Sequence, residues 1–327
     1  THTHPHTPTH THTHPHTHTH THTVHLGGTR IIKKTKKNRK KKTHKHNLNI
    51  QNPSHRGFLF MKILVVGDPH GKLIKKFPKD VDIILITGDL GKADLGRKFA
   101  FDNIEREKKG LPKIEENKKI IFDMHKEIYD SAMKVVKYYS KIALTYAISG
   151  NVGGGGDAEI RKENKKWKLK MPMLWKDLKK VKNFHLISNR FVNVNGLRIG
   201  GLEYFIDTCW VREFKPKNYS EALRNAKKET VKAKKILKWF GKNKIDILLC
   251  HQPPYGILDK VIAKYAPKHW YGKHAGSKAV LDFVKKDKNL KYVFCGHMHE
   301  TRGKKKVGKI EVFNAGVAGE YYVVDIN

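Results

Sequence analysis

Residues 61–71 read MKILVVGDPHG, and this stretch decides the fold on which the rest of the chain is built. The apolar residues 63–66 form an unbroken, largely β-branched run, which is typical of a strand buried on both faces of a sheet. Gly67 ends the run, and Asp68 and His70 follow directly. Because ligand sites of open α/β sheets lie beyond the carboxyl ends of the strands, the stretch predicts a buried strand that delivers a carboxylate and an imidazole to such a site.

The same arrangement recurs after four more apolar runs. In order, they are DIILITGD with Asp89 (82–89), IALTYAISGN with Asn151 (142–151), DILLCHQPP with His251 (246–254), and YVFCGHMH with His297 and His299 (292–299). Each motif alone is a weak signal, since a polar residue at a strand end is usually a cap or a satisfied hydrogen-bonding group. Together they supply two Asp, one Asn and four His, a mixed oxygen and imidazole set that suits borderline divalent metals and contains no thiolate.

From Met61 onward, short β-branched runs alternate with longer helical patterns, which indicates an α/β fold. The expected strands are 63–66, 83–87, 142–148, 245–250, 292–295 and 311–313. The pair Asn195-Gly196 between 191–194 and 197–200 predicts a hairpin, so some antiparallel sheet is mixed in. Apolar residues at helical spacing predict helices over 121–139 and 223–240. We interpret the lysine-rich stretch 90–141 as surface in preference to a cap over the site.

Residues 1–60 form a low-complexity segment that is rich in Thr and His and then in Lys. It contains too little apolar surface to offset the entropy of ordering, so we expect it to be disordered. A repeated AC dinucleotide encodes alternating Thr and His, and we therefore interpret residues 1–23 as translated repetitive DNA, with Met61 as the initiator and 61–327 as the folded domain. Two alternatives stay open: metal capture by the histidines, and nucleic-acid binding by the basic run 33–45.

The composition limits which cellular compartment and which partners are expected. No apolar run approaches the roughly 20 residues needed to cross a bilayer, so no membrane partner is expected. The cysteines Cys209, Cys250 and Cys295 contain no C-x-x-C pair, which argues against a disulfide framework and favours a reducing cytoplasm. Nothing in the sequence defines an oligomeric state.

The chain is strongly basic, with a net charge of +37. Removing the 11 bases of residues 1–60 from the total of 67 leaves 56 against 30 acids, so the remaining body carries +26. Such a charge attracts phosphate-bearing partners and makes nucleic acid one candidate partner. A lysine-rich composition with solvated faces explains the charge equally well.

In this order, the five motifs resemble the calcineurin-like metallophosphoesterase superfamily over essentially all of residues 61–327. HQPPYGILDKV, HAGSKAVLDFV and GHMHE are most similar to small prokaryotic, archaeal-type metallophosphoesterases related to cyclic-nucleotide phosphodiesterases. The resemblance implies an α/β fold, a four-layer α/β/β/α sandwich of two mixed β-sheets flanked by helices. It also makes 61–327 a metallophosphoesterase domain.

The resemblance further implies two divalent metal ions, such as Mn, Fe, Zn or Ni, and a role for each motif residue. Asp68, His70 and His299 would hold the first ion. Asn151, His251 and His297 would hold the second, and Asp89 would bridge the two. A hydroxide activated by both ions would attack the phosphorus of a phosphoester substrate, so Asp89 and His251 are expected to be catalytic through the metals.

One position departs from the family pattern. The family commonly has a His after the Asn, which contacts the phosphate and protonates the leaving group, whereas Val152 and four glycines follow Asn151 here. No general acid is identified, and His125, His274 and Asp157 are weak substitutes that we interpret as structural. The glycines 153–156 would form a lip over the phosphate.

The sequence thus favours hydrolysis of phosphodiesters over monoesters. The alternatives are a nuclease, suggested by the basic body, and a catalytically inactive scaffold that binds nucleic acid. Retention of all seven polar residues argues against the scaffold, because their burial is costly unless a metal satisfies them.

Overall fold

The computed structural model describes residues 60–326 except 154–155 and 265. The predictions of disorder, metal capture and nucleic-acid binding for residues 1–60 therefore concern residues that, apart from Phe60, lie outside the described ones. The predicted glycine lip at 153–156 lies outside them in part as well.

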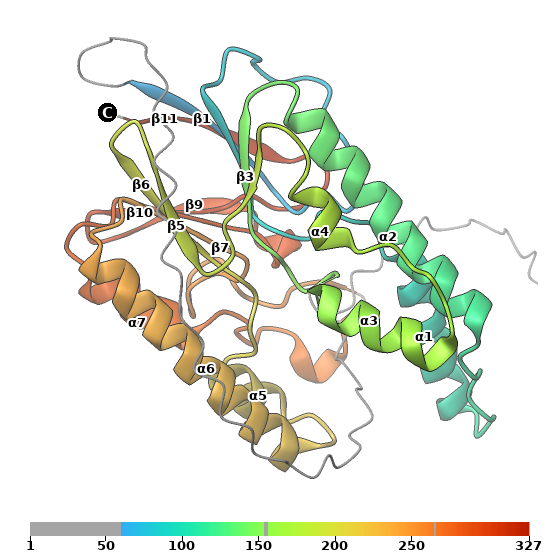
Figure 1. Ribbon diagram of the computed structural model, residues 1–327. Helices are drawn as coiled ribbons and strands as arrows, with labels where there is room; N and C mark the ends of the chain where they lie inside the picture. Colours follow the sequence, from blue (N-terminus) through green and yellow to red (C-terminus); the bar gives the residue numbers. More distant parts are fainter. Residues whose placement is uncertain (1–59, 154–155, 265, 327) are drawn as a thin grey trace, which may run out of the picture.

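The described strands form two mixed sheets (Figure 1). Sheet one has the order β11-β1-β2-β3-β4, and sheet two has the order β5-β6-β7-β8-β10-β9. The bounds are β1 Met61–Val66, β2 Ile83–Ile86, β3 Leu144–Ala147, β4 Phe184–Leu186, β5 Arg190–Val194, β6 Leu197–Leu202, β7 Ile247–Cys250, β8 Tyr292–Cys295, β9 Gly303–Val307, β10 Ile310–Asn314 and β11 Tyr321–Ile326. In sheet one, β1 to β4 are parallel and the edge strand β11 is antiparallel to β1. In sheet two, β6, β7, β8 and β10 are parallel and the edge strands β5 and β9 are antiparallel.

The described helices are α1 Asp94–Lys108, α2 Lys118–Tyr139, α3 Gly156–Trp167, α4 Leu174–Leu178, α5 Thr208–Phe214, α6 Tyr219–Lys242 and α7 Lys278–Lys286, with 3-10 turns η1 Lys268–Trp270 and η2 His299–Thr301. The predicted helices 121–139 and 223–240 are confirmed and lie within α2 and α6. The predicted hairpin is confirmed as β5–β6, with φ of 51° at Asn195 and 90° at Gly196. No helix within the described residues has the length and apolar character needed to cross a lipid bilayer.

The inner faces of the two sheets pack on each other and form the central core. Alternate residues of β1, such as Ile63 and Val65, meet Leu249 of β7, Phe294 of β8 and Phe313 of β10 there, and all five are at most 4% exposed. Because side chains alternate across a strand, the neighbours of these residues point outward and must be covered by another layer.

Helices cover both outer faces. Leu64 of β1 packs under α2 and α4, against residues such as Val136 and Leu178. On sheet two, Leu248 of β7 packs under α6 and α7, against residues such as Leu237 and Val280. The four-layer α/β/β/α sandwich is thereby confirmed. In the lysine-rich stretch, α2 is a core-facing helix, whereas α1 has no fully buried residue.

Candidate metal centre

The loops at the carboxyl ends of the parallel strands bring all seven predicted side chains together. They lie after β1 (Asp68, His70), β2 (Asp89), β3 (Asn151), β7 (His251) and β8 (His297, His299). Strands of both sheets contribute, so the centre lies where the carboxyl ends of the two sheets meet. Among the described residues, Asp68 groups with His70 and His299, and also with Asp89 and His251, with potential ligand atoms of each group within 4.8 Å of one another.

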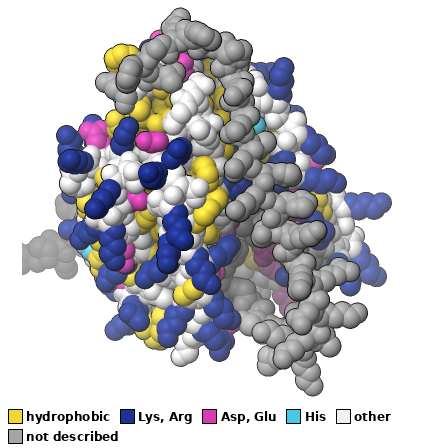
Figure 2. All heavy atoms as spheres, turned by 60° about the vertical axis from the view of Figure 1, so that its left-hand side comes forward, with side chains coloured by type: hydrophobic (Ala, Val, Ile, Leu, Met, Phe, Trp, Pro, Cys, Tyr) yellow, Lys and Arg dark blue, Asp and Glu magenta, His cyan; other side chains and the backbone are white. Residues whose placement is uncertain are grey.

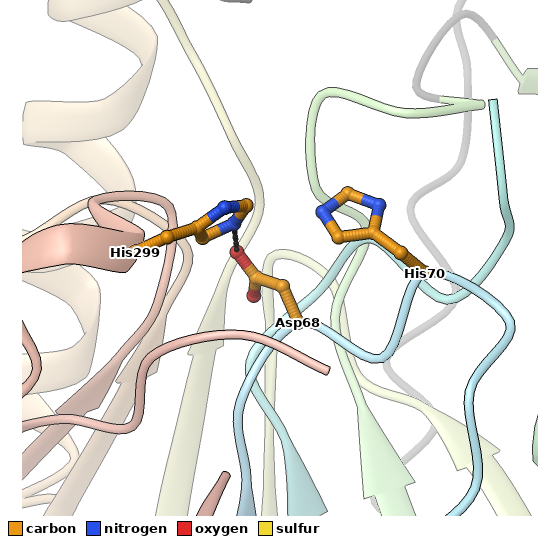
Figure 3. Close-up of side chains that lie close together, drawn as sticks. All are labelled: Asp68, His70 and His299. Atoms are coloured by element: carbon orange, nitrogen blue, oxygen red, sulfur yellow. Dashed lines mark hydrogen bonds and ion pairs between the residues drawn. The ribbon is translucent and has the colours of Figure 1, made fainter. Parts of the chain in front are cut away.

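Asp68 is fully buried and held on both carboxylate oxygens. Thr87 Oγ1 donates to Oδ1 at 2.7 Å, and the backbone N–H of His297 donates to Oδ2 at 2.6 Å. Nε2 of His299 lies 3.3 Å from Oδ2, and Figure 3 shows the His299 and His70 rings on either side of the carboxylate. Burial by itself raises the pKa of Asp68. The nearby imidazoles of His251 and His299 lower it by more than burial raises it, so the net pKa lies well below the usual range. The carboxylate is therefore charged at neutral pH.

A second group of donors surrounds His251. Its Nδ1 lies 3.0 Å from the carbonyl oxygen of Thr87, the distance of a hydrogen bond from Nδ1–H. That tautomer leaves a lone pair on Nε2, which faces Oδ1 of Asn151 at 2.7 Å. Nδ1 of His297 lies 3.0 Å from the same Asn151 oxygen and 3.2 Å from His251 Nε2. Electron-rich atoms that converge in this way fit a bound cation.

Asp89 lies between the two groups. Its Oδ2 is 3.7 Å from Nε2 of His70 and 3.7 Å from Nε2 of His251, one residue from each group. Its Oδ1 accepts a 2.7 Å hydrogen bond from the backbone N–H of Val152, which fixes the carboxylate. This placement is the one required of a ligand shared by two ions.

The backbone is strained at three of the predicted ligands. His70, Asp89 and His297 have φ of 44°, 40° and 64°, in the left-handed region that residues other than glycine adopt rarely. Such conformations cost on the order of 1–3 kcal/mol each and cluster at functional sites. The strain turns each side chain toward the centre immediately after its strand.

Glycines let neighbouring backbone approach the two carboxylates. A Cβ on Gly150 would collide with Oδ1 of Asp89, and a Cβ on Gly296 would collide with Oδ1 of Asp68 and lie 2.6 Å from Thr87 Oγ1. The loops after β3 and β8 therefore press against the carboxylates in a way that only glycine allows.

The residues present fit a divalent metal centre. Burial lowers the pKa of His70 to about 4, with Asp89 opposing the shift, so its imidazole is neutral and its lone pair is available at neutral pH. Two buried carboxylates, an amide oxygen and four imidazoles form a donor set for Mn, Fe, Zn or Ni. Burying the carboxylates is also less costly when cations neutralise them.

Two residues beside the centre were not found from the sequence. Arg97 of α1 lies with Nη2 3.3 Å from Nδ1 of His70. The ring of Tyr204 lies 5.6 Å from His251 and 5.3 Å from His297, centroid to centroid. Neither follows a strand-end motif, so no sequence signal separated Arg97 from other helix arginines or Tyr204 from a core aromatic residue.

The three weak candidates for a general acid each have a partner away from the centre. His125 Nε2 lies 2.8 Å from the carbonyl oxygen of Pro172, and burial lowers the pKa of this histidine. His274 Nδ1 lies 2.7 Å from Oδ1 of Asp259. Asp157 accepts a hydrogen bond from the backbone N–H of Trp175 at 3.0 Å. These contacts favour structural roles.

Comparison with known proteins places the site in a family. Curated proteins gave no match. Three solved chains are similar in fold. One is 18% identical with a TM-score of 0.48 over 82% of this chain and 95% of that one. A dimetal phosphatase from Danio rerio is 10% identical with a TM-score of 0.43, and the match covers 80% of this chain and 88% of that chain. The NAD nucleotidase NadN of Haemophilus influenzae is 12% identical with a TM-score of 0.36, and the match covers 81% of this chain and 49% of that chain.

The family model for calcineurin-like phosphoesterases matches residues 61–301, well over half of the chain and all five motifs. The chain therefore belongs to the calcineurin-like phosphoesterase family and is a hydrolase of phosphoester bonds.

Proposed function

We propose that this chain hydrolyses phosphodiesters in preference to monoesters, with 61–327 as its catalytic domain and two divalent metal ions as its cofactors. Asp68, His70 and His299 would hold one ion, Asn151, His251 and His297 would hold the other, and Asp89 would be shared by both. The observation that carries the proposal is the position of Asp89, whose Oδ2 lies 3.7 Å from a histidine nitrogen of each group.

When bound, two divalent ions withdraw charge from the phosphoryl oxygens and lower the pKa of a water molecule toward roughly 7. The chain's own residues supply the geometry. The Val152 N–H holds Asp89, while Thr87 orients Asp68 through its hydroxyl and His251 through its carbonyl oxygen. Outer contacts of this kind fix the tautomer and direction of each ligand before substrate arrives.

The proposed preference for diesters rests on the family resemblance, because some members that act on diesters also lack the His that Val152 replaces here. The Val152 side chain has no proton to give where the family resemblance places a proton-donating His. General acid catalysis is worth roughly 10²- to 10⁴-fold, so its loss is tolerated best with esters whose leaving groups need no protonation. Val152 thus favours esters with good leaving groups over esters with poor ones.

A nuclease is the second candidate. The body carries +26, and Figure 2 shows Lys and Arg side chains spread over the face of the molecule that includes α6. A basic surface raises the local concentration of nucleic acid, which is itself a phosphodiester.

The proposed compartment is the cytoplasm. Cys209, Cys250 and Cys295 are buried and form no disulfide. Burial raises the pKa of the Cys209 thiol to about 12, with Asp207 adding to the shift. The thiols therefore remain protonated and unreactive, as expected for a reducing environment.

The experiment loads the full chain with Mn²⁺ and measures kcat/KM for bis(p-nitrophenyl) phosphate, p-nitrophenyl phosphate and a single-stranded oligonucleotide. We expect the nitrophenyl diester to exceed the monoester. We expect His251→Ala to lower turnover by more than the roughly 100-fold typical of losing an outer contact. His269→Ala, which removes an exposed imidazole, is the matched control. A monoester preference would refute the substrate assignment, and cleavage confined to the oligonucleotide would favour the nuclease.

A further inference from the structure

A recess of about 350 Å³ opens beside the metal centre on the side of Asn151. The loops that follow β3 and β6 line it, together with α3 and α6. Ligand sites span roughly 300–1,000 Å³, so this recess is large enough for a small organic group and too small for a folded partner. It shares a wall with the predicted metal ligands, because Asn151 lines it.

Tyr204 forms the wall between the recess and the metal centre. Its ring makes a T-shaped contact with His251 and a tilted contact with His297, and its backbone N–H donates to the carbonyl oxygen of Ser149 at 3.1 Å. Since Asn151 also lines the recess, a phosphodiester whose phosphate lies at the centre would extend one of its two ester arms along Tyr204 into the recess.

The charge of the recess is opposite to that of the molecule. Three carboxylates line it, Glu159 of α3, Glu203 after β6 and Glu229 of α6, against the single base Lys232. Lys232 pairs with Glu203 at 2.7 Å, and Glu229 accepts a 2.7 Å hydrogen bond from the backbone N–H of Ile206, which fixes its direction. A protein body with +26 net charge thus presents acidic groups next to the phosphate position, where a further anionic group would be repelled.

Aliphatic side chains form part of the remaining lining. Leu202 and Ala233 are 1% and 2% exposed, and Ile236 is half-buried. Carboxylates around an aromatic ring and an aliphatic floor suit an organic cation, whose charge interacts with the acids and the π face and whose carbon atoms contact the floor. A strongly hydrated metal ion or a polyanion would match this lining poorly.

Building on the proposed function, we propose that the recess is the subsite for one arm of the phosphodiester, and that this arm ends in an organic cation such as an alkylammonium group. The Tyr204 ring and the carboxylates of Glu203 and Glu229 recognise the cation. The basic exterior attracts the phosphate-bearing substrate, and the acidic recess then selects among such substrates by their second arm.

The test compares two substrates that differ in one atom. p-Nitrophenyl phosphorylcholine carries a trimethylammonium group, and p-nitrophenyl 3,3-dimethylbutyl phosphate replaces its nitrogen with carbon. In both, water supplies the oxygen that bonds to phosphorus, the P–O bond to nitrophenol breaks, and a proton is released. We expect kcat/KM to be about tenfold higher for the cationic ester, the factor that corresponds to 1.4 kcal/mol. Equal values, or a preference for the neutral ester, would overturn the proposal.

Charge-neutral variants locate the effect. Glu203→Gln and Glu229→Gln keep the side-chain shape and an oxygen acceptor, and each should bring the ratio of cationic to neutral ester toward one. Glu221→Gln removes the same charge from the same helix outside the recess and should leave the ratio as in the wild type. If the ratio of cationic to neutral ester falls equally in all three variants, general surface charge explains the preference, and the subsite is contradicted.

A binding measurement decides the matter even without turnover. Calorimetric titration of the full chain with choline phosphate and with 3,3-dimethylbutyl phosphate should show tighter binding of the former, and Glu229→Gln should remove the difference. Equal affinities would refute the recess proposal while leaving phosphoester hydrolysis intact. Cation-selective binding without hydrolysis of either nitrophenyl ester would instead support the recess and count against the proposed function. Inhibition of p-nitrophenyl phosphorylcholine hydrolysis by soluble glycerophosphocholine or by phosphatidylcholine vesicles identifies the source of the arm, and inhibition by neither would contradict the subsite.

Discussion

The backbone N–H of His297 donates a 2.6 Å hydrogen bond to Oδ2 of Asp68, although the two residues lie 229 positions apart in the chain. Asp68 follows β1 of sheet one and His297 follows β8 of sheet two. The bond therefore joins the carboxyl ends of the two sheets at the metal centre. The integrity of the centre depends on how closely these loops approach each other, and this can be tested by small changes.

Adding a single methyl group at Gly150 should disrupt the centre. In Gly150→Ala the new Cβ collides with the carboxylate of Asp89, so we expect metal affinity to fall roughly 10- to 100-fold, as for loss of an outer contact. Metal content after gel filtration measures the effect. Gly96→Ala is the control, because its Cβ would lie 3.6 Å from Met124 Sδ, an ordinary contact. Full metal retention in Gly150→Ala would contradict the geometry.

Asn314 supports the histidine loop from β10. It is fully buried, and its Nδ2 donates to the carbonyl oxygens of Met298 at 2.7 Å and Leu258 at 3.2 Å. Asn314→Asp would place an acceptor against both carbonyls. We expect a loss of about 2–4 kcal/mol in the free energy of unfolding, since buried acceptors are left facing each other.

Urea unfolding measures this loss, and metal content should fall with it because Met298 separates His297 from His299. Asn193→Asp makes the same change where the side chain only accepts, from the Gly196 N–H, and should be nearly neutral. Equal stability of the two variants would show that Asn314 does not position the loop.

Asp207 should give the protein a component of acid sensitivity. Burial raises the pKa of Asp207, but donation from Ala279 N–H, Ser277 O–H and Cys209 N–H outweighs it, so the folded pKa lies below the usual value. A depressed folded pKa contributes stability above the unfolded value of roughly 3.9 and loses it as the pH falls from there through the folded pKa.

We therefore expect Asp207→Asn to cost about 1.5–3 kcal/mol at pH 7, the range for hydrogen bonds to a charged group, and less near pH 3. Thermal unfolding of both proteins across this pH range provides the measurement. Asp102→Asn, an exposed change on α1, should stay within about 0.5 kcal/mol of the wild type at each pH. A destabilisation of Asp207→Asn that does not change with pH would contradict the assignment.

Val152→His should restore proton donation to the leaving group. The backbone N–H that holds Asp89 is kept, and the new imidazole follows Asn151 as in the family pattern. We expect the rate on phenyl esters to rise by about 10²-fold and that on nitrophenyl esters to rise less, because a good leaving group needs no proton. The slope of log kcat/KM against leaving-group pKa measures this, with Val152→Asn as the control. An unchanged slope would place residue 152 away from the leaving group.

The central strands and the polar residues at their ends could be predicted from the sequence because their signal is local. An apolar run followed directly by an Asp, Asn or His needs no tertiary information, and the seven residues found in this way converge in the structure. The division of the strands into two sheets depends on long-range pairing and followed only from the family resemblance.

Other elements gave no local signal. The edge strand β9 includes Lys304, Lys305 and Lys306, residues with low strand propensity, and it forms because it pairs with β10 across a turn that contains Gly308. Arg97 and Tyr204 contact the centre only through the packing of α1 and of the loop after β6. Their roles depend on distances in the folded chain, and these distances cannot be predicted from the spacing of residues in the sequence.

We propose that Asp89 lies at a centre that would hold two divalent metal ions and hydrolyse phosphoesters. The most direct measurement adds Mn²⁺ to the chelated full chain and follows bound metal and bis(p-nitrophenyl) phosphate turnover together, for wild type and Asp89→Ala. The histidines of residues 1–23 offer further ligands, so the difference between the two proteins reports the centre. We predict that the wild type binds more metal, that its turnover rises as the second ion of the centre binds, and that Asp89→Ala stays inactive. Turnover that survives chelation, or that is equal in both proteins, would contradict the account.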